Sequence, residues 1–170
     1  MPRSTPAFPS LLLLAACQGE QAPAPAIHPA EGHWSLSVLE TTEDTCGIAD
    51  SLPPSAGYTL AWADADTGET GQPFTLDPDD TDATWTCTFQ EPEFSCALTR
   101  TEGGSAGGAS YTLTYAWVLE GSFSSDTEAA GTHALTLACD GALCDDIAEQ
   151  QAIAFPCGLS FTVALSADAP

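Results

Sequence analysis

Short segments in which apolar and polar residues alternate are the feature of this sequence that most constrains its fold. Successive side chains of a β-strand point to opposite faces of a sheet, so this period of two predicts strands with one buried face. Clusters of Gly, Pro, Ser and Asp separate the segments and predict turns. The alternating apolar residues are Trp34, Leu36 and Val38; Tyr58, Leu60 and Trp62; Phe74 and Leu76; Trp85, Cys87 and Phe89; Phe94, Cys96 and Leu98; Tyr111, Leu113, Tyr115, Trp117 and Leu119; Leu135, Leu137 and Cys139; and Leu159, Phe161, Val163 and Leu165. Only residues 145–154 offer a short helix, so the sequence predicts an all-β fold.

The number of these segments indicates one domain of about eight short antiparallel strands. A chain of 170 residues has the length of a single domain, which we place at residues 31–170. Such strands form either an up-and-down barrel or a two-sheet sandwich. The alternation favours neither, because both architectures bury one face of each strand.

Residues 85–98 predict a hairpin whose register can be set residue by residue. With residues 90–93 as the loop, Phe89 faces Phe94 and Cys87 faces Cys96. The apolar side chains then share one face, and a shift by one residue would bury the Thr and Ser set instead. Directly opposed β-carbons lie within bonding range, so this register predicts a disulfide between Cys87 and Cys96.

The cysteine content indicates an exported domain stapled by disulfides. The chain has seven cysteines, and setting aside Cys17 near the N-terminus leaves an even number. Six cysteines in an exported domain predict up to three disulfides, whereas structural zinc would require closely spaced Cys and His pairs. The favoured pairs are Cys87 with Cys96, Cys139 with Cys144, and Cys46 with Cys157. Other pairings of the last four cysteines stay open at this point.

The N-terminal residues have the features of an export signal. An apolar run follows Arg3 and ends in the tetrapeptide LAAC at residues 14–17. The run is far shorter than the roughly 20 residues with which a helix spans a bilayer. LAAC resembles the lipobox of bacterial lipoprotein precursors, in which the cysteine carries a diacylglycerol and the signal is cleaved before it. The resemblance implies a signal peptide at residues 1–16 and an acyl anchor on Cys17 in the lipid bilayer. An ordinary cleaved signal, with Cys17 in the core or in a disulfide, is the alternative.

Residues 17–30 are rich in proline and contain one bulky apolar residue, Ile27. Such a segment cannot bury enough apolar surface to order itself, so it predicts a semi-extended tether. Gln18 follows the anchor position, and a residue other than Asp at this place resembles the signal that sorts enteric lipoproteins onward. We therefore expect an exported outer-membrane lipoprotein, on either face of that membrane.

The charge of the chain excludes two classes of partner. Against 24 acidic residues stand Arg3 and Arg100, with no lysine, for a formal charge of -22. Nucleic acid binding needs cations to neutralise phosphates, and a basic patch is needed to hold an anionic membrane surface. The acidity is typical of proteins from saline habitats and of soluble surfaces that repel anionic lipid.

Motifs of catalysis are absent from the sequence. It has no GxSxG, HExxH, P-loop or GxGxxG pattern, and its histidines are His28, His33 and His133. We therefore expect a non-catalytic protein without a cofactor. A hydrolase would have to start from His133 with one of many Asp or Ser residues, and it is kept as an alternative.

Two acidic runs are candidates for calcium. Alternating carboxylates supply the oxygen ligands that Ca²⁺ prefers, although neither run has the Gly and terminal Glu of an EF-hand loop. Plain acidic turns are the competing interpretation. The candidate ligands are Asp77, Asp79, Asp80 and Asp82, with residues 64–69 as the second run.

The sequence Gly32-His33-Trp34 at the start of the first strand resembles the GxW opening of lipocalin-like barrels. That resemblance implies a Trp that closes one barrel end with an Arg across its ring, here Trp34 and Arg100. The plain alternative places Arg100 at the rim, solvated or paired with a carboxylate. The resemblance also implies a carrier of a small apolar ligand, the alternative to a lipoprotein with another binding or structural role.

Overall fold

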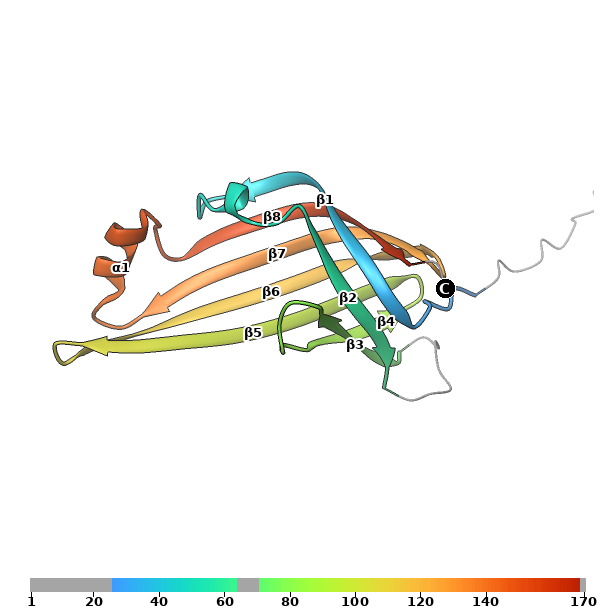
Figure 1. The fold of residues 1–170 in the computed structure, drawn as a ribbon, viewed down its shortest axis with the longest axis horizontal. Helices are drawn as coiled ribbons and strands as arrows, with labels where there is room; N and C mark the ends of the chain where they lie inside the picture. The colour runs from blue at the N-terminus through green and yellow to red at the C-terminus, as the bar shows by residue number, and fades with distance from the viewer. Residues whose placement is uncertain (1–25, 64–70, 169–170) are drawn as a thin grey trace, which may run out of the picture.

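The computed structural model describes residues 26–63 and 71–168, which form a closed eight-stranded antiparallel barrel (Figure 1). The strands follow one another around the barrel in chain order, and β1 closes it by pairing with β8. The strands are β1 (Gly32–Asp44), β2 (Ser55–Trp62), β3 (Pro73–Pro78), β4 (Trp85–Gln90), β5 (Glu93–Ala106), β6 (Ala109–Ser125), β7 (Glu128–Asp140) and β8 (Cys157–Ala167). The fold is thus the up-and-down barrel and not the sandwich. The predicted signal peptide at 1–16, Cys17 and the acidic run 64–69 lie outside the described residues.

The strands differ in length, so the barrel wall is uneven in height. β5 and β6 have 14 and 17 residues and pair to the end of their hairpin at Ala106 and Ala109, whereas β3 and β4 have 6 residues each. Figure 1 shows the β5–β6 hairpin projecting past the end of β7, near the helix α1 (Cys144–Gln151). The short strands therefore leave part of the interior less covered than the long ones do. None of the helices in the described ranges is long and apolar enough to cross a bilayer.

Two glycines allow β6 and β7 to approach closely beside the core. Gly121 faces Gly131 across the ladder, and a β-carbon on either one would collide with the backbone of the other strand. Glycine is needed where two backbones come this close. The interior next to this pair is filled by Phe94 and Phe123, whose ring centroids lie 4.8 Å apart.

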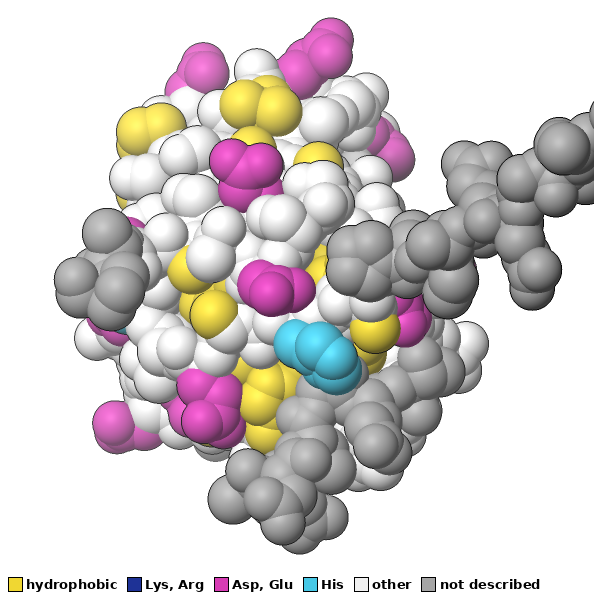
Figure 2. Space-filling model, turned by 90° about the vertical axis from the view of Figure 1, so that its right-hand side faces the viewer, with side chains coloured by type: hydrophobic (Ala, Val, Ile, Leu, Met, Phe, Trp, Pro, Cys, Tyr) yellow, Lys and Arg dark blue, Asp and Glu magenta, His cyan; other side chains and the backbone are white. Residues whose placement is uncertain are grey.

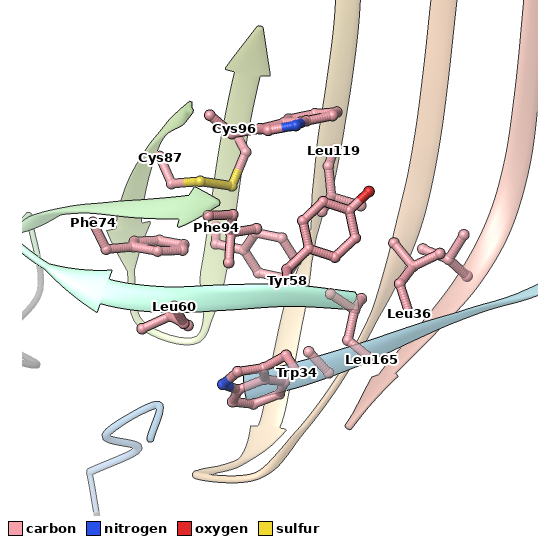
Figure 3. Packing of buried hydrophobic residues seen from close by; sticks show 14 of the residues in the cluster. Trp34, Leu36, Tyr58, Leu60, Phe74, Cys87, Phe94, Cys96, Leu119 and Leu165 are labelled. Carbon is pink, nitrogen blue, oxygen red and sulfur yellow. A yellow bond between two sulfur atoms is a disulfide. The ribbon is translucent and has the colours of Figure 1, made fainter. Parts of the chain in front are cut away.

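Aromatic side chains fill the end of the barrel at which β1 begins. Trp34 is 1% exposed and meets Phe123 edge to face at a centroid distance of 5.7 Å. Figure 3 shows Trp34, Leu60, Phe74 and Phe94 converging on the same interior space from different strands. Each comes from the apolar parity of its strand, so the predicted alternation places the core. Burial of this apolar surface is the main stabilising contribution in a fold with no helical layer over the sheet.

The hairpin formed by β4 and β5 has the predicted register. Phe89 pairs with Phe94, and Cys87 with Cys96. The loop is shorter than predicted, because Gln90 and Glu93 also pair and leave only two residues in the turn. The burial pattern of β4 alternates strictly, which is the condition that excludes a slipped register.

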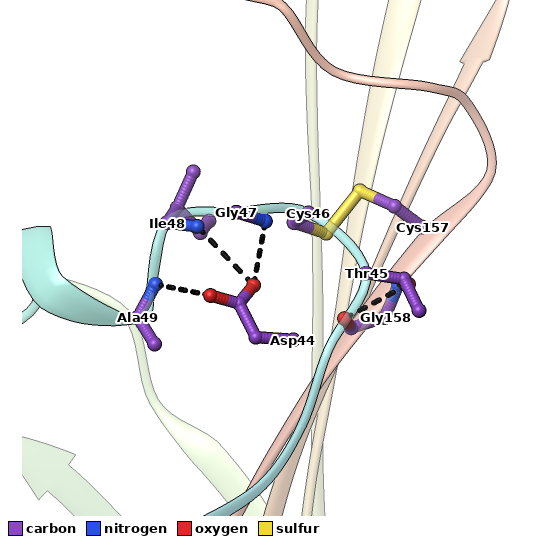
Figure 4. Close-up of a disulfide and its surroundings, with 8 residues drawn as sticks. All are labelled: Asp44, Thr45, Cys46, Gly47, Ile48, Ala49, Cys157 and Gly158. Atoms are coloured by element: carbon purple, nitrogen blue, oxygen red, sulfur yellow. Dashed lines mark hydrogen bonds between the residues drawn. A yellow bond between two sulfur atoms is a disulfide. The ribbon is translucent and has the colours of Figure 1, made fainter.

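Three disulfides staple the barrel, and they join the pairs that the sequence analysis favoured. Cys87–Cys96 lies in the main core, and Cys139–Cys144 links the end of β7 to α1. Cys46–Cys157 joins the loop after β1 to the start of β8 (Figure 4). Beside it, the hydroxyl of Thr45 donates to the Gly158 carbonyl at 3.1 Å and accepts from the Gly158 N–H at 2.7 Å.

The last residues of the predicted tether are held against the barrel. The N–H of Ile27 donates to Glu91 and that of His28 to Asp126, and the Ala30 carbonyl accepts from the Trp34 indole at 2.8 Å. Ile27 also packs on the main core. Contacts with the barrel thus extend to residue 27, because backbone groups of this segment find partners that its composition did not reveal.

Candidate ligand-binding site

The barrel interior away from Trp34 is not filled by side chains. It contains two adjoining hollows of about 240 and 190 Å³. Apolar side chains form most of the wall of the larger one: Leu36, Val38, Trp85, Leu98, Trp117 and Phe161. The four tryptophans thus have different roles, because Trp34 and Trp62 belong to the packed half while Trp85 and Trp117 line the hollow.

His133 on β7 places a polar ring in the mostly apolar wall of the larger hollow. It lines both hollows and lies between aromatic rings, with centroids 5.4 Å from Trp85 and 6.4 Å from Phe161. Its Nε2 atom is buried and has no hydrogen-bond partner among the described residues. Burial lowers the pKa of His133 to about 4, so the ring is neutral at pH 7.

The mouth of the larger hollow lies between the β1–β2 loop, the β3–β4 turn and β5. Leu52 stands at the loop, Asp80 and Thr81 at the turn, and Arg100 on β5. Leu52 is 41% exposed although it is apolar, as expected for a side chain at an opening.

The β1–β2 loop is fixed at its base by a disulfide and a hydrogen-bonded carboxylate (Figure 4). Asp44 accepts hydrogen bonds from the backbone N–H groups of Gly47, Ile48 and Ala49, at 2.6, 3.2 and 3.0 Å. These bonds, led by the one from Ala49, hold the pKa of Asp44 below its usual value. The 3₁₀ turn η1 (Ala49–Ser51) that carries the chain to Leu52 is therefore held in place.

The structure does not bring Trp34 and Arg100 together, so the predicted barrel-end contact is wrong. The Arg100 guanidinium bonds Glu102 instead, with Nη2 2.8 Å from Oε1, and remains 58% exposed. Arg100 lies on the inward-facing side of β5, but this stretch of β5 extends beyond the packed part of the barrel. The interpretation of a rim arginine paired with a carboxylate is the one that holds.

The predicted calcium ligands are not gathered into one site. Among residues 26–63 and 71–168, no group of three or more His, Cys, Asp and Glu side chains is arranged to hold a metal ion. Of Asp77, Asp79, Asp80 and Asp82, Asp79 bonds His33 and Asp80 stands at the mouth of the hollow. Figure 2, which looks at the end where β1 begins, shows acidic side chains scattered over the surface and not collected in one patch.

A histidine bridge on the outer surface was missed by the sequence analysis. Nε2 of His33 lies 2.7 Å from Asp79, and Nδ1 lies 2.7 Å from Asp168. The bridge crosses β2 at Gly57, where a β-carbon would collide with Asp79 and lie 2.8 Å from the His33 ring. The hydrogen bonds to Asp79 and then Asp168 raise the pKa of His33. A glycine inside an otherwise regular strand was the one signal of this close approach.

The bridge has the wrong connectivity for hydrolysis. A catalytic histidine needs one nitrogen free to accept a proton from its nucleophile. Both nitrogens of His33 face carboxylates, and the nearby hydroxyl of Ser35 bonds Asp168 at 3.2 Å and not the ring. This cluster joins strands and does not activate a nucleophile.

A wider concavity of about 600 Å³ lies on the outside of the barrel over β4 to β7. Thr88, Ser95, Glu120 and Thr132 supply much of its lining, on the outward parity of their strands. Polar side chains offer little apolar area to a ligand, so the interior hollow is the better candidate site.

Comparison of the chain with protein-family models, with curated proteins and with solved structures gave no match. The resemblances to lipoprotein precursors and to lipocalin-like barrels therefore stay predictions from the residues that carry them.

Proposed function

We propose that this protein binds a small apolar molecule inside its barrel and that a lipid on Cys17 anchors it to the outer membrane. The observation that carries the first part is the apolar hollow enclosed by Trp85, Trp117 and Phe161. Concave sites with apolar walls and a few polar groups are the usual places for small ligands.

The size of the hollow limits the ligand. A volume of about 240 Å³ holds about eight non-hydrogen atoms at roughly 30 Å³ each. The adjoining 190 Å³ offers room for a longer molecule if the side chains between the hollows shift. The expected ligand is therefore a compact ring or short chain and not a long lipid.

The position of the mouth agrees with a lipid anchor at the N-terminus. The chain enters β1 at the packed end, where Ala30 bonds the Trp34 indole, and the β1–β2 loop lies at the other end (Figure 1). A protein held through Cys17 would thus present its mouth away from the attachment point. A ligand could then exchange with the surrounding solution without crossing the anchoring surface.

Isothermal titration with 4-ethyltoluene, a neutral hydrocarbon of suitable size, tests the binding function. The wild-type domain should bind it with a dissociation constant on the order of 0.1 mM, given the few atoms in contact. Leu98→Trp places a large ring in the hollow and should abolish binding. Leu39→Trp, at a side chain that is 63% exposed, is the matched control and should bind normally. Absence of binding to the wild type, or equal binding by Leu98→Trp, would refute the proposal.

A further inference from the structure

The wall of the hollow contains a polar atom for which the protein supplies no partner. Nε2 of His133 is buried among Trp85 and Phe161 without a hydrogen bond from any described residue. Buried polar atoms in native proteins are nearly always hydrogen-bonded, because an unpaired one has lost its bond to water without replacement. An exception in the wall of a ligand-sized hollow indicates a partner that comes with the ligand.

The His133 ring stands where a ligand can reach it. Together with Leu52, Trp117 and Phe161, it lines both hollows, so these side chains form the partition between them. The terminal torsion of histidine has a broad energy profile, so rotation about it can turn a ring nitrogen toward a ligand in the hollow. A ligand that fills the larger hollow therefore has the imidazole beside it.

The protonation states of His133 and Tyr58 decide which chemical group of a ligand can hydrogen-bond in the hollow. A neutral imidazole has one nitrogen that donates and one that accepts. Tyr58 also lines the hollow, and burial, with a smaller effect of Asp80, raises its pKa to about 12. Its hydroxyl stays protonated, is directed away from Trp34 in Figure 3, and bonds no other described residue. A ligand hydroxyl, which both donates and accepts, suits either tautomer of His133 and also Tyr58.

The charges at the mouth disfavour a ligand that carries a carboxylate in place of the hydroxyl. Arg100, the cation of the mouth, is already paired with Glu102 at 2.8 Å. Asp80 stands at the same rim, and the chain as a whole carries a formal charge of -22. An anionic ligand would lose its hydration without gaining a free cation.

We propose that the hollow selects a neutral apolar molecule with one hydroxyl group, which hydrogen-bonds the imidazole of His133. This inference rests on the proposed function and specifies the ligand class of the same site. Three compounds that share a ring and an ethyl group separate the possibilities: 4-ethylphenol, 4-ethyltoluene and 4-ethylbenzoate. They differ only in a hydroxyl, a methyl or a carboxylate at the same position.

Titration calorimetry at pH 7 should rank these compounds. The phenol should bind roughly 3- to 10-fold tighter than the hydrocarbon, the value of one net hydrogen bond, and the benzoate should bind weakest. His133→Phe should remove the preference for the phenol while still binding the hydrocarbon. His28→Phe, a histidine that does not line the hollow, is the control and should keep the preference.

The outcomes distinguish this inference from the binding function. If the hydrocarbon binds as tightly as the phenol, or if His133→Phe keeps the preference, the inference is wrong and the binding function stands. If none of the compounds binds, both fall. A measurement on the wild type removes any dependence on the folding of the variant: the imidazole ¹⁵N shifts of His133 should change more with 4-ethylphenol, which bonds the ring, than with 4-ethyltoluene, which only lies beside it. Shifts with bound phenol no larger than those with the hydrocarbon would overturn the proposal.

Discussion

Removing the Cys46–Cys157 disulfide should destabilise the barrel more than removing the Cys87–Cys96 disulfide, because the two close chain loops of different length. Cys46 and Cys157 are 111 residues apart, and Cys87 and Cys96 are 9 apart. Each disulfide restricts the unfolded chain, and this should raise the free energy of unfolding by about 4.8 kcal/mol for the long loop and by about 2.7 kcal/mol for the short one. All four cysteines are at most 4% exposed, so the packing lost on replacement by Ala is similar in the two pairs. The difference of about 2 kcal/mol therefore reports the loop closure.

Urea unfolding followed by tryptophan fluorescence measures this difference. The double variant Cys46→Ala/Cys157→Ala should have the lower free energy of unfolding, and Cys87→Ala/Cys96→Ala should lie between it and the wild type. Both variants should still unfold in one two-state transition, and the dependence of the free energy on urea should be steeper than in the wild type, most of all for the long loop, whose unfolded state expands more. Equal or reversed destabilisation would show that local packing around Cys87 and Cys96, and not chain closure, determines the effect.

Three further outcomes follow from the charges and the anchor. Because the hydrogen bonds to Asp79 and Asp168 raise the pKa of His33 above 6.5, its contribution is full below that pH and is lost as the pH rises through the folded pKa. The melting temperature of the wild type should therefore fall over that range relative to His33→Gln. NaCl should raise the melting temperature, because it screens the repulsion of a chain with charge -22, and Ca²⁺ at equal ionic strength should add nothing. Protein isolated from cells should partition into detergent and yield an acylated N-terminal peptide, and Cys17→Ser should abolish both.

Each of these outcomes has a clear opposite. A pH profile identical in His33→Gln and wild type would remove the bridge as a source of stability. A specific Ca²⁺ effect that Asp79→Asn removes would restore the calcium site. A soluble mature form that begins elsewhere than Cys17 would contradict the lipid anchor.

Local alternation was sufficient to predict the strands, the β4–β5 register and the core. These features depend on which face of each strand is apolar, and that is written in neighbouring residues. Closure into a barrel was not predictable, because it depends on β1 pairing with β8 across more than a hundred residues. That pairing contains register shifts near Glu40 and Glu43 that no local pattern indicates.

The parts of the site that escaped prediction are those in which residues meet across strands. Asp79 was considered with its neighbours in sequence, as a calcium ligand, whereas its partner is His33 on β1. Arg100 lies on the inward-facing side of β5, but an inward-facing side chain is buried only where other strands cover the interior in front of it. His133 shares the inward parity of Leu135 and Leu137, and a histidine at such a position was the sequence signal of a polar group in the apolar wall.

The central claim is that a small molecule binds inside the barrel, and a ¹H–¹⁵N NMR titration with 4-ethylphenol tests it most directly. The indole signals of Trp85 and Trp117, which line the hollow, should shift and saturate together. The indole of Trp34, which bonds Ala30 in the packed half, should not move. Shifts confined to the outer concavity around Thr132, or no saturable shift in the millimolar range, would contradict the account.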